Sequence, residues 1–243
     1  SMGLLQPAQP HHVEGQDVGE ELGIVLYEPP LEMGAKALSG EVEAYAGYNL
    51  LVKYDIEGQR KYSDVLKEGE EVVVSEKIHG ASSRYIYDEG RLWVGSRGEI
   101  KKHSEQSVWW RIAKQHDLEN KLKTLEGIAL YGEVFGWVQS LRYGAKPSEI
   151  FFAAFDMLDV KTGQWLPYDE FRAKTEKLGL PIVPELYRGP YHKGLWSMVD
   201  GNTTISGAGH IREGIVIKPT VERWEKSLGR VILKLHSEAF LLL

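Results

Sequence analysis

The stretch VVVSEKIHGASSRY, residues 72–85, contains the pattern that decides the fold. Its three valines are typical of a buried strand, because β-branched residues favour the extended chain. The strand ends at Lys77, and after a short break at 78–80 a second strand-like run follows at 81–87. A lysine at the end of a buried strand is costly unless its charge is paired or used, although the ammonium can also reach past the apolar surface to water. Whether Lys77 has a function or only reaches water has to be inferred from the rest of the sequence.

Other segments predict an α+β fold with antiparallel sheets. We expect a short element at 62–67, strands at 85–87, 91–94, 128–133, 150–158, 213–218 and 230–235, and helices at 107–125 and 169–178. Gly90 lies between the first two of these strands and suits the positive φ of a tight hairpin turn. Polar residues recur at strand ends, which predicts that the sheets border a common cleft.

The domain division follows from composition. Residues 1–40 are rich in loop-forming residues and show no periodicity, so they are predicted to form a linker or arm; residues 41–243 are predicted to form one domain. The start, Ser1-Met2-Gly3, is typical of an expression remnant, and the chain ends on the apolar Phe240–Leu243. Together these features predict a domain cut from a longer protein.

The overall composition narrows the functional classes. The chain has no cysteine, which excludes disulfides, thiolate metal sites and a cysteine nucleophile. Its net charge of −6 argues against indiscriminate binding of polyanions, but a local basic cleft remains compatible with it. No apolar run reaches the length of a membrane span and no secretory signal is present, so a cytoplasmic location is predicted.

A lysine followed three residues later by glycine is a weak signal, and it occurs twice, at Lys77 and at Lys226. The segments that follow Lys77 distinguish the two. They are GSRG at 95–98, YGEVFG at 131–136, FFAAFD at 151–156, EGIVIK at 213–218 and ILK at 232–234. Each of the longer segments places a charged or aromatic residue beside a glycine or at the edge of a strand. Almost nothing comparable follows Lys226.

These side chains together predict a nucleotide site without a glycine-rich phosphate loop. The cations suit phosphates, the carboxylates suit a divalent metal ion or sugar hydroxyls, and an aromatic ring suits a purine. The residues concerned are Lys77, Arg97, Lys218, Lys234, Glu133, Glu213 and Phe155.

The ordered set resembles the covalent nucleotidyltransferase superfamily, which comprises ATP-dependent DNA and RNA ligases and mRNA capping enzymes. The resemblance implies a nucleotidyltransferase (ATP-grasp-like) fold, in which residues 41–243 form an adenylyltransferase domain. Within the superfamily, EKIHG at 76–80 is similar to the RNA ligases that seal nicked duplexes. YEPP at 27–30 resembles the linker of a subgroup with an OB-fold module before this domain, a module that would be missing here.

The resemblance implies a role for each matching residue. Lys77 would attack the α-phosphorus of ATP and become lysyl-AMP, and a lysine can do so only when it is neutral. Glu213 would orient Mg²⁺ or Mn²⁺. The nucleotide-binding set would comprise Glu76, with Arg97 and Glu133 holding the ribose, Phe155 and Ile215 (or Val216) on the two faces of the base, and Lys218 and Lys234 on the α-phosphate. His79, Ser82 and Arg84 are further candidates.

The implied substrate is a nicked duplex of RNA, or an RNA/DNA hybrid, with 3′-hydroxyl and 5′-phosphate ends, bound by a monomer. Two departures bear on sealing: Ala81-Ser82 stand where relatives often have Thr-Asn, and His236 stands where a second lysine is common. The alternatives are a DNA ligase, a capping-type guanylyltransferase that uses GTP, and a nucleic-acid-binding module that has lost its chemistry.

Overall fold

The computed structural model describes residues 9–13, 42–43 and 53–243. The chain divides into two units, Ser1–Ser39 and Gly40–Leu243, and all that follows concerns the second. Most of the predicted arm, including the segments 1–3 and 27–30, lies outside the described residues. No helix in the described part is both long and apolar enough to cross a membrane.

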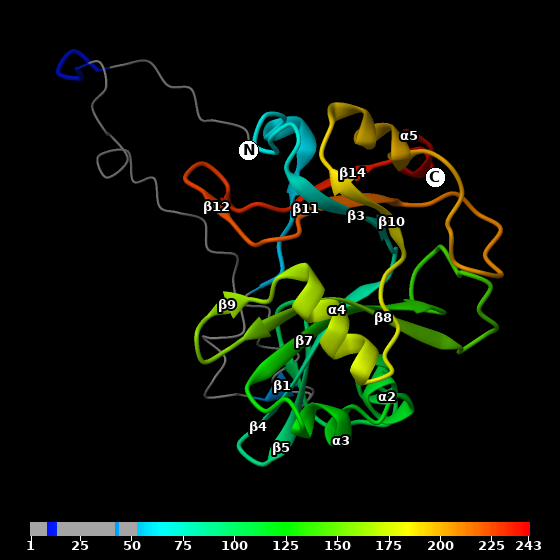
Figure 1. Ribbon diagram of the computed structural model, residues 1–243. Coiled ribbons are helices and arrows are strands. Elements are labelled where there is room, and N and C mark those ends of the chain that lie inside the picture. Colours follow the sequence, from blue (N-terminus) through cyan, green and yellow to red (C-terminus); the bar gives the residue numbers. More distant parts are fainter. Residues whose placement is uncertain (1–8, 14–41, 44–52) are drawn as a thin grey trace. The chain divides into compact units, whose positions relative to one another are not determined.

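Two sheets form the framework of this unit (Figure 1). The seven-stranded sheet has the order β1-β6-β5-β4-β7-β8-β9, and the five-stranded sheet has the order β10-β3-β11-β14-β2. The first contains β1 Val42–Glu43, β4 Ala81–Asp88, β5 Arg91–Ser96, β6 Ile100–Lys101, β7 Ile128–Gly136, β8 Ile150–Asp159 and β9 Gln164–Trp165. The second contains β2 Glu57–Gly58, β3 Glu71–Lys77, β10 Glu185–Pro190, β11 Gly214–Pro219 and β14 Leu233–His236.

All strand pairs in these sheets are antiparallel except β14 with β2, among the described residues. The prediction of an α+β fold with antiparallel sheets is confirmed. A small hairpin, β12 Trp224–Glu225 with β13 Gly229–Arg230, lies in the connection between β11 and β14.

Helices cover the seven-stranded sheet on the face that carries Tyr85 and Leu130. They are α2 Val108–Gln115, α3 Leu118–Lys123 and α4 Tyr168–Lys177. The single helix predicted over 107–125 is therefore two helices, because Asp117 adopts a positive φ of 51° between them. The 3-10 helices η2 Gln59–Lys61 and η3 Lys193–Val199 contact β14 of the five-stranded sheet, and the short α5 Glu238–Leu241 follows β14 in the chain.

The remaining differences from the sequence prediction are local. The element expected at 62–67 consists of turns and bends that follow η2. The strand expected at 230–235 is divided between β13, which ends at Arg230, and β14, which begins at Leu233.

The chain passes from one sheet to the other at residues 77–81, which we call the lysine corner. β3 ends at Lys77 in the five-stranded sheet, and β4 begins at Ala81 in the seven-stranded sheet. Gly80 fits this corner because a Cβ atom there would lie 2.3 Å from the carbonyl oxygen of Val134. The break after Lys77 is therefore the crossing between the two layers.

Strand periodicity decides which β3 side chains face the other sheet. Val72 and Val74 pack in the core of the five-stranded sheet, whereas Val73 packs in the core of the seven-stranded sheet. Because side chains alternate along a strand, Lys77 shares the face of Val73. The lysine is thus directed between the sheets.

Candidate active site

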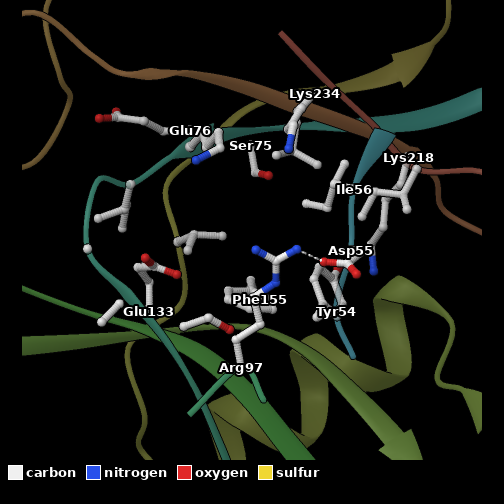
Figure 2. A pocket seen from close by; sticks show the side chains of 18 of the residues that line it. Tyr54, Asp55, Ile56, Ser75, Glu76, Arg97, Glu133, Phe155, Lys218 and Lys234 are labelled. Atoms are coloured by element: carbon white, nitrogen blue, oxygen red, sulfur yellow. Dashed lines mark hydrogen bonds and ion pairs between the residues drawn. The ribbon is translucent and has the colours of Figure 1, made fainter. Parts of the chain in front are cut away.

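A cavity of about 470 Å³ lies between the two sheets, beside the connection from β3 to β4. Figure 2 shows Lys218 and Lys234 on the side of the five-stranded sheet, and Glu133, Phe155 and Arg97 on the side of the seven-stranded sheet. The cavity is lined by Tyr54, Asp55, Ile56, Val73, Ser75, Glu76, Lys77, Ile78, Gly80, Ala81, Ser82, Ser96, Arg97, Trp109, Glu133, Phe155, Tyr168, Val183, Val216, Lys218, Ile232 and Lys234. Its size is that of an ordinary small-molecule pocket.

Lys77 pairs with the carboxylate of Glu213. Its Nζ lies 2.5 Å from Glu213 Oε1, and about a quarter of the lysine side chain is exposed to the cavity. Glu213 directly precedes β11, and Gly214 is the register partner of Lys77. The antiparallel pairing of β3 with β11 therefore brings together two residues that are 136 positions apart.

Two histidines complete the surroundings of Glu213. His236 Nε2 lies 3.4 Å from Oε1, and His79 Nδ1 lies 3.5 Å from Oε2. Burial raises the pKa of Glu213, but the hydrogen bond from His236 and the nearby Lys77 charge outweigh it, so the net pKa is lowered. Glu213 is therefore held as a carboxylate.

Glu213 suits a divalent metal ion whose other ligands would come from a bound substrate and from water. Oε2 of Glu213 is buried and receives no hydrogen bond from the described residues. Within those same residues no cluster of three His, Asp or Glu side chains could bind a metal ion by itself. Magnesium ions are commonly bound in this way, by one or two carboxylates together with substrate phosphates and water.

Glu133 of β7 is a second acid in the cavity. Burial raises its pKa to about 8; the Glu213 charge adds to this, and the Lys77 charge opposes it. Its carboxyl group therefore stays largely neutral near pH 7, and a neutral carboxyl can donate as well as accept a hydrogen bond.

The three other cations predicted from sequence also line the cavity, but their present partners differ. Arg97 pairs with Asp55 across the cavity, as Figure 2 shows. Lys218 Nζ lies 3.0 Å from Asp156 Oδ2. Burial lowers the pKa of Lys234, as do the nearby Lys77 and Arg97 charges. Lys234 is thus a cation that an incoming anion would stabilise.

The aromatic wall is formed by Phe155 together with Tyr54. Phe155 lines the cavity, and its ring centroid lies 4.6 Å from that of Tyr54. The Tyr54 hydroxyl donates a hydrogen bond of 2.7 Å to Asp156, so this ring is fixed in place. The two rings are inclined at 48° to each other and together form an aromatic wall, which suits stacking of a base.

Two residues predicted to bind nucleotide direct their side chains elsewhere. Ile215 is fully buried in the core of the five-stranded sheet, and Val216 lines the cavity instead. Glu76 contributes to the cavity wall, but Figure 2 shows its carboxylate turned away. That carboxylate accepts hydrogen bonds from Thr203 and Thr204. The physical reason is the same in both strands: neighbours of a cavity-facing residue point to the opposite face.

The three further candidate residues from the sequence, His79, Ser82 and Arg84, differ in their positions relative to the cavity. Ser82 lines the cavity, and its carbonyl oxygen accepts a hydrogen bond from Trp109 Nε1 at 3.1 Å. His79 lies behind Lys77 and contacts Glu213 and Ser140. Arg84 is buried, with its side chain close to Gly95, and does not line the cavity.

Sequence reasoning missed the segment 54–56, which supplies Tyr54, Asp55 and Ile56 to the wall. It also assigned no role to Asp156, which ends the segment FFAAFD at 151–156. The segment 54–56 carries no recognisable pattern, whereas a buried aspartate after an apolar run could have suggested a paired cation.

Residues 70–236 match the RNA ligase family, and this range contains all the cavity residues except the segment 54–56. The chain belongs to the RNA ligase family. Its fold is similar to the structure described as Naegleria gruberi RNA ligase with PPi, with a TM-score of 0.72 and 25% identity. That match covers 94% of this chain and 67% of the Naegleria chain.

Another solved structure shows the same fold. The E312A mutant of the Naegleria gruberi RNA ligase, solved with AMP and Mn, gives a TM-score of 0.71 at 24% identity, over 94% of this chain and 67% of that one. A curated viral relative, Protein Early 65 kDa of Autographa californica nuclear polyhedrosis virus, is 24% identical over 127 residues. This match covers 47% of the present chain and only 22% of the viral protein. The nucleotidyltransferase fold predicted from sequence is confirmed.

Proposed function

We propose that this chain is an ATP-dependent RNA ligase whose covalent intermediate forms on Lys77. The observation that carries the proposal is the position of Lys77. Its side chain lines a cavity that is also lined by Lys218, Lys234, Arg97 and the ring of Phe155. A lysine nucleophile, cations for phosphates and an aromatic face are the groups that nucleotidyl transfer to lysine requires.

In the first step, the neutral amine of Lys77 forms a bond to the α-phosphorus of ATP. The bond to the bridging oxygen breaks, pyrophosphate leaves, and the amine releases one proton to water. Lys218 and Lys234 stabilise the negative charge on the α-phosphate, and Glu133 and Arg97 hold the ribose. Phe155 and Val216 enclose the base. A divalent metal ion held by Glu213 would neutralise charge on the phosphates.

The next two steps transfer AMP and join the ends. A 5′-phosphate oxygen attacks the phosphorus of lysyl-AMP, the P–N bond breaks, and Lys77 regains its proton. A 3′-hydroxyl then attacks that 5′-phosphate, a phosphodiester forms, AMP leaves, and the hydroxyl proton is released. Division into separate transfers replaces one difficult condensation by easier displacements.

Several finer features belong to the same proposal. The substrate is a nicked RNA duplex or RNA/DNA hybrid, as EKIHG at 76–80 indicates, and the metal ion is Mg²⁺ or Mn²⁺. An N-terminal OB-fold module accompanies this domain in the subgroup suggested by the sequence. A monomeric state and a cytoplasmic location are predictions from sequence and composition.

Intact mass after incubation with ATP and Mg²⁺ or Mn²⁺ tests the central step. We expect an acid-labile AMP adduct on the native chain and on Lys226→Met, and none on Lys77→Met. Lys226 is a matched control, because it too precedes a glycine by three residues and is exposed.

The other candidate functions predict different results in adduct formation or in sealing. A GMP adduct formed in preference to AMP would indicate a capping-type guanylyltransferase. Sealing of nicked DNA in preference to RNA by the adenylylated chain would indicate a DNA ligase. No adduct with either nucleotide and either metal ion would contradict the proposal and favour a binding module without chemistry.

A further inference from the structure

The loop between β7 and β8, residues 137–149, carries an exposed tryptophan and a partly buried arginine that nucleotidyl transfer to Lys77 does not use. Trp137 is 43% exposed, although it is a large apolar side chain. The guanidinium carbon of Arg142 lies 4.2 Å from the centroid of its ring. Arg142 lies over one face of the exposed indole and is itself partly buried, so the loop combines an aromatic ring with a cation, the two groups that contact bases and phosphates.

The loop is attached to the segment that carries the nucleophile. The backbone N–H of His79 donates a hydrogen bond of 2.7 Å to the Tyr143 hydroxyl, and His79 Nε2 lies 3.2 Å from Ser140 Oγ. Tyr143 is almost completely buried, so the inner side of the loop is fixed against residues 78–80. The loop therefore borders, on its inner side, the segment that follows Lys77.

Backbone contacts hold the loop in one shape. Trp137 N donates to Glu149 O at 2.8 Å, and Ala145 N donates to Arg142 O at 2.9 Å. Gly144 packs so closely on Gly207 that a Cβ atom would lie 2.6 Å from its carbonyl oxygen. A surface that is already ordered loses little conformational entropy when a ligand binds.

The charge of the loop suits a polyanion. Arg142 and Lys146 are its basic residues, and Arg111 of α2 donates a hydrogen bond of 2.7 Å to Ser148 O. Glu149 is the only acid in residues 137–149, and its carboxylate accepts a hydrogen bond from Lys146 N at 2.9 Å. This basic loop contrasts with a net charge of −6 for the chain.

We propose that Trp137 and Arg142 bind the polynucleotide end that reacts at Lys77, with one nucleobase stacked on the indole and Arg142 on an adjacent phosphate. The inference rests on the proposed function and names the surface that presents its substrate. Stacking on an aromatic ring tolerates any base, whereas phosphate contact contributes a salt-dependent attraction.

The experiment compares RNA binding with adenylylation in the same variants. A fluorescent, 5′-phosphorylated RNA oligonucleotide, single-stranded or in a nicked duplex, is titrated with the full chain and followed by anisotropy. We expect Trp137→Ala to weaken binding roughly 5- to 150-fold, the range of base–aromatic stacking. Arg142→Ala should weaken binding and reduce the slope of log K against log salt by about 0.7–0.9, the share of one phosphate contact.

The controls come from the same chain. Trp224 of β12 is 54% exposed, and Figure 1 shows β12 on the opposite side of this unit from the loop between β7 and β8, so Trp224→Ala removes an indole elsewhere. Lys193→Ala removes an exposed cation on η3. Both should bind RNA as the native chain does, and all variants should form lysyl-AMP and melt like the native chain.

RNA affinity of Trp137→Ala within about twofold of the native chain would overturn the inference, and so would an equal loss in Trp224→Ala. Retained RNA binding with a normal AMP adduct would leave the proposed function intact and assign the loop to a protein partner instead. Absence of the adduct in the native chain would contradict the proposed function, whatever the RNA titration shows.

Discussion

At the residue scale, the environment of Lys77 depends most on Glu213. The two side chains lie 2.5 Å apart, and Glu213 is the acid proposed to hold a divalent ion. Replacement by glutamine keeps the shape but removes the charge. We therefore expect Glu213→Gln to slow lysyl-AMP formation on the order of 100-fold or more, since metal-ion charge neutralisation contributes several kcal/mol to such steps.

The measurement is the rate of AMP adduct formation by mass spectrometry at several Mn²⁺ concentrations. Glu225→Gln, which removes a carboxylate from the small hairpin, is the control and should react at the native rate. A native rate for Glu213→Gln at every Mn²⁺ concentration would show that Glu213 holds neither the lysine nor the ion.

Glu133 should make stability depend on pH. Its pKa is about 8 in the folded chain and 4.5 ordinarily, chiefly because of burial. Between these values the folded chain keeps a proton that the unfolded chain has lost. The stabilisation is therefore complete below pH 4.5 and is lost as the pH rises through about 8.

We expect Glu133→Gln, which imitates the neutral acid, to become more stable than the native chain as the pH rises. The difference should grow by on the order of 2–4 kcal/mol between pH 5 and pH 9, given about 1.4 kcal/mol per unit of pKa. Urea unfolding at each pH measures it. The same change at exposed Glu119 of α3 is the control; a gap that stays constant for Glu133→Gln would disprove the assignment.

Individual residues of the site could be predicted to different extents. Lys77 was identified because ordered motifs follow it, and not because of its own neighbours. The sequence does not distinguish Ile215 from Val216, because it does not say which strand face meets the cavity. Asp55 had no signal at all, since its contribution depends on a salt bridge to Arg97 that only the folded chain forms.

At the element scale, the close pairing of β11 with β14 limits what can stand at Gly214. A Cβ atom there would lie 2.1 Å from the carbonyl oxygen of Leu235, which is a backbone atom that cannot rotate away. We expect Gly214→Ala to destabilise the chain by about 1–3 kcal/mol, the usual cost of overpacking. Because Gly214 is also the register partner of Lys77, adenylylation should slow as well.

Thermal or urea unfolding tests this expectation. Gly58 of β2 provides the matched control, because it is also a strand glycine but has open space where its Cβ would be. Gly58→Ala should stay within about 0.5 kcal/mol of the native chain, as surface substitutions usually do. Equal stability of the two variants would mean that β14 can move away from β11 at little cost.

It was easier to predict that a segment forms a strand than to predict which other strand it pairs with. The valines of β3 and the apolar run of β8 have local signals, so both were expected from sequence. The pairing of β3 with β11 joins residues far apart in the chain, and no local pattern encodes it. The break at Asp117 was also missed, because the apolar spacing continues through both α2 and α3.

At the scale of the whole molecule, a buried group of charges connects the two sheets at the cavity. Asp156 belongs to β8, and it accepts hydrogen bonds from Lys218 of β11 at 3.0 Å and from Arg230 of β13 at 2.6 Å. Glu222 also contacts both cations. Burial alone raises the pKa of Asp156, but Arg230 and Lys218 more than offset this, so the acid is charged.

We expect Asp156→Asn to destabilise the chain by about 3–5 kcal/mol, the usual cost of breaking a buried ion pair, because Glu222 alone does not balance the two cations Lys218 and Arg230. ATP should restore part of the loss, since its phosphates supply negative charge beside Lys218 and since any ligand of the folded state stabilises it. Urea unfolding with and without ATP measures both effects. Asp169→Asn removes a comparable contact, the exposed pair with Arg188 at 2.7 Å, and should cost less than about 1 kcal/mol. A loss in Asp156→Asn no larger than in Asp169→Asn would show that packing alone, and not this charge group, holds the two sheets around the cavity.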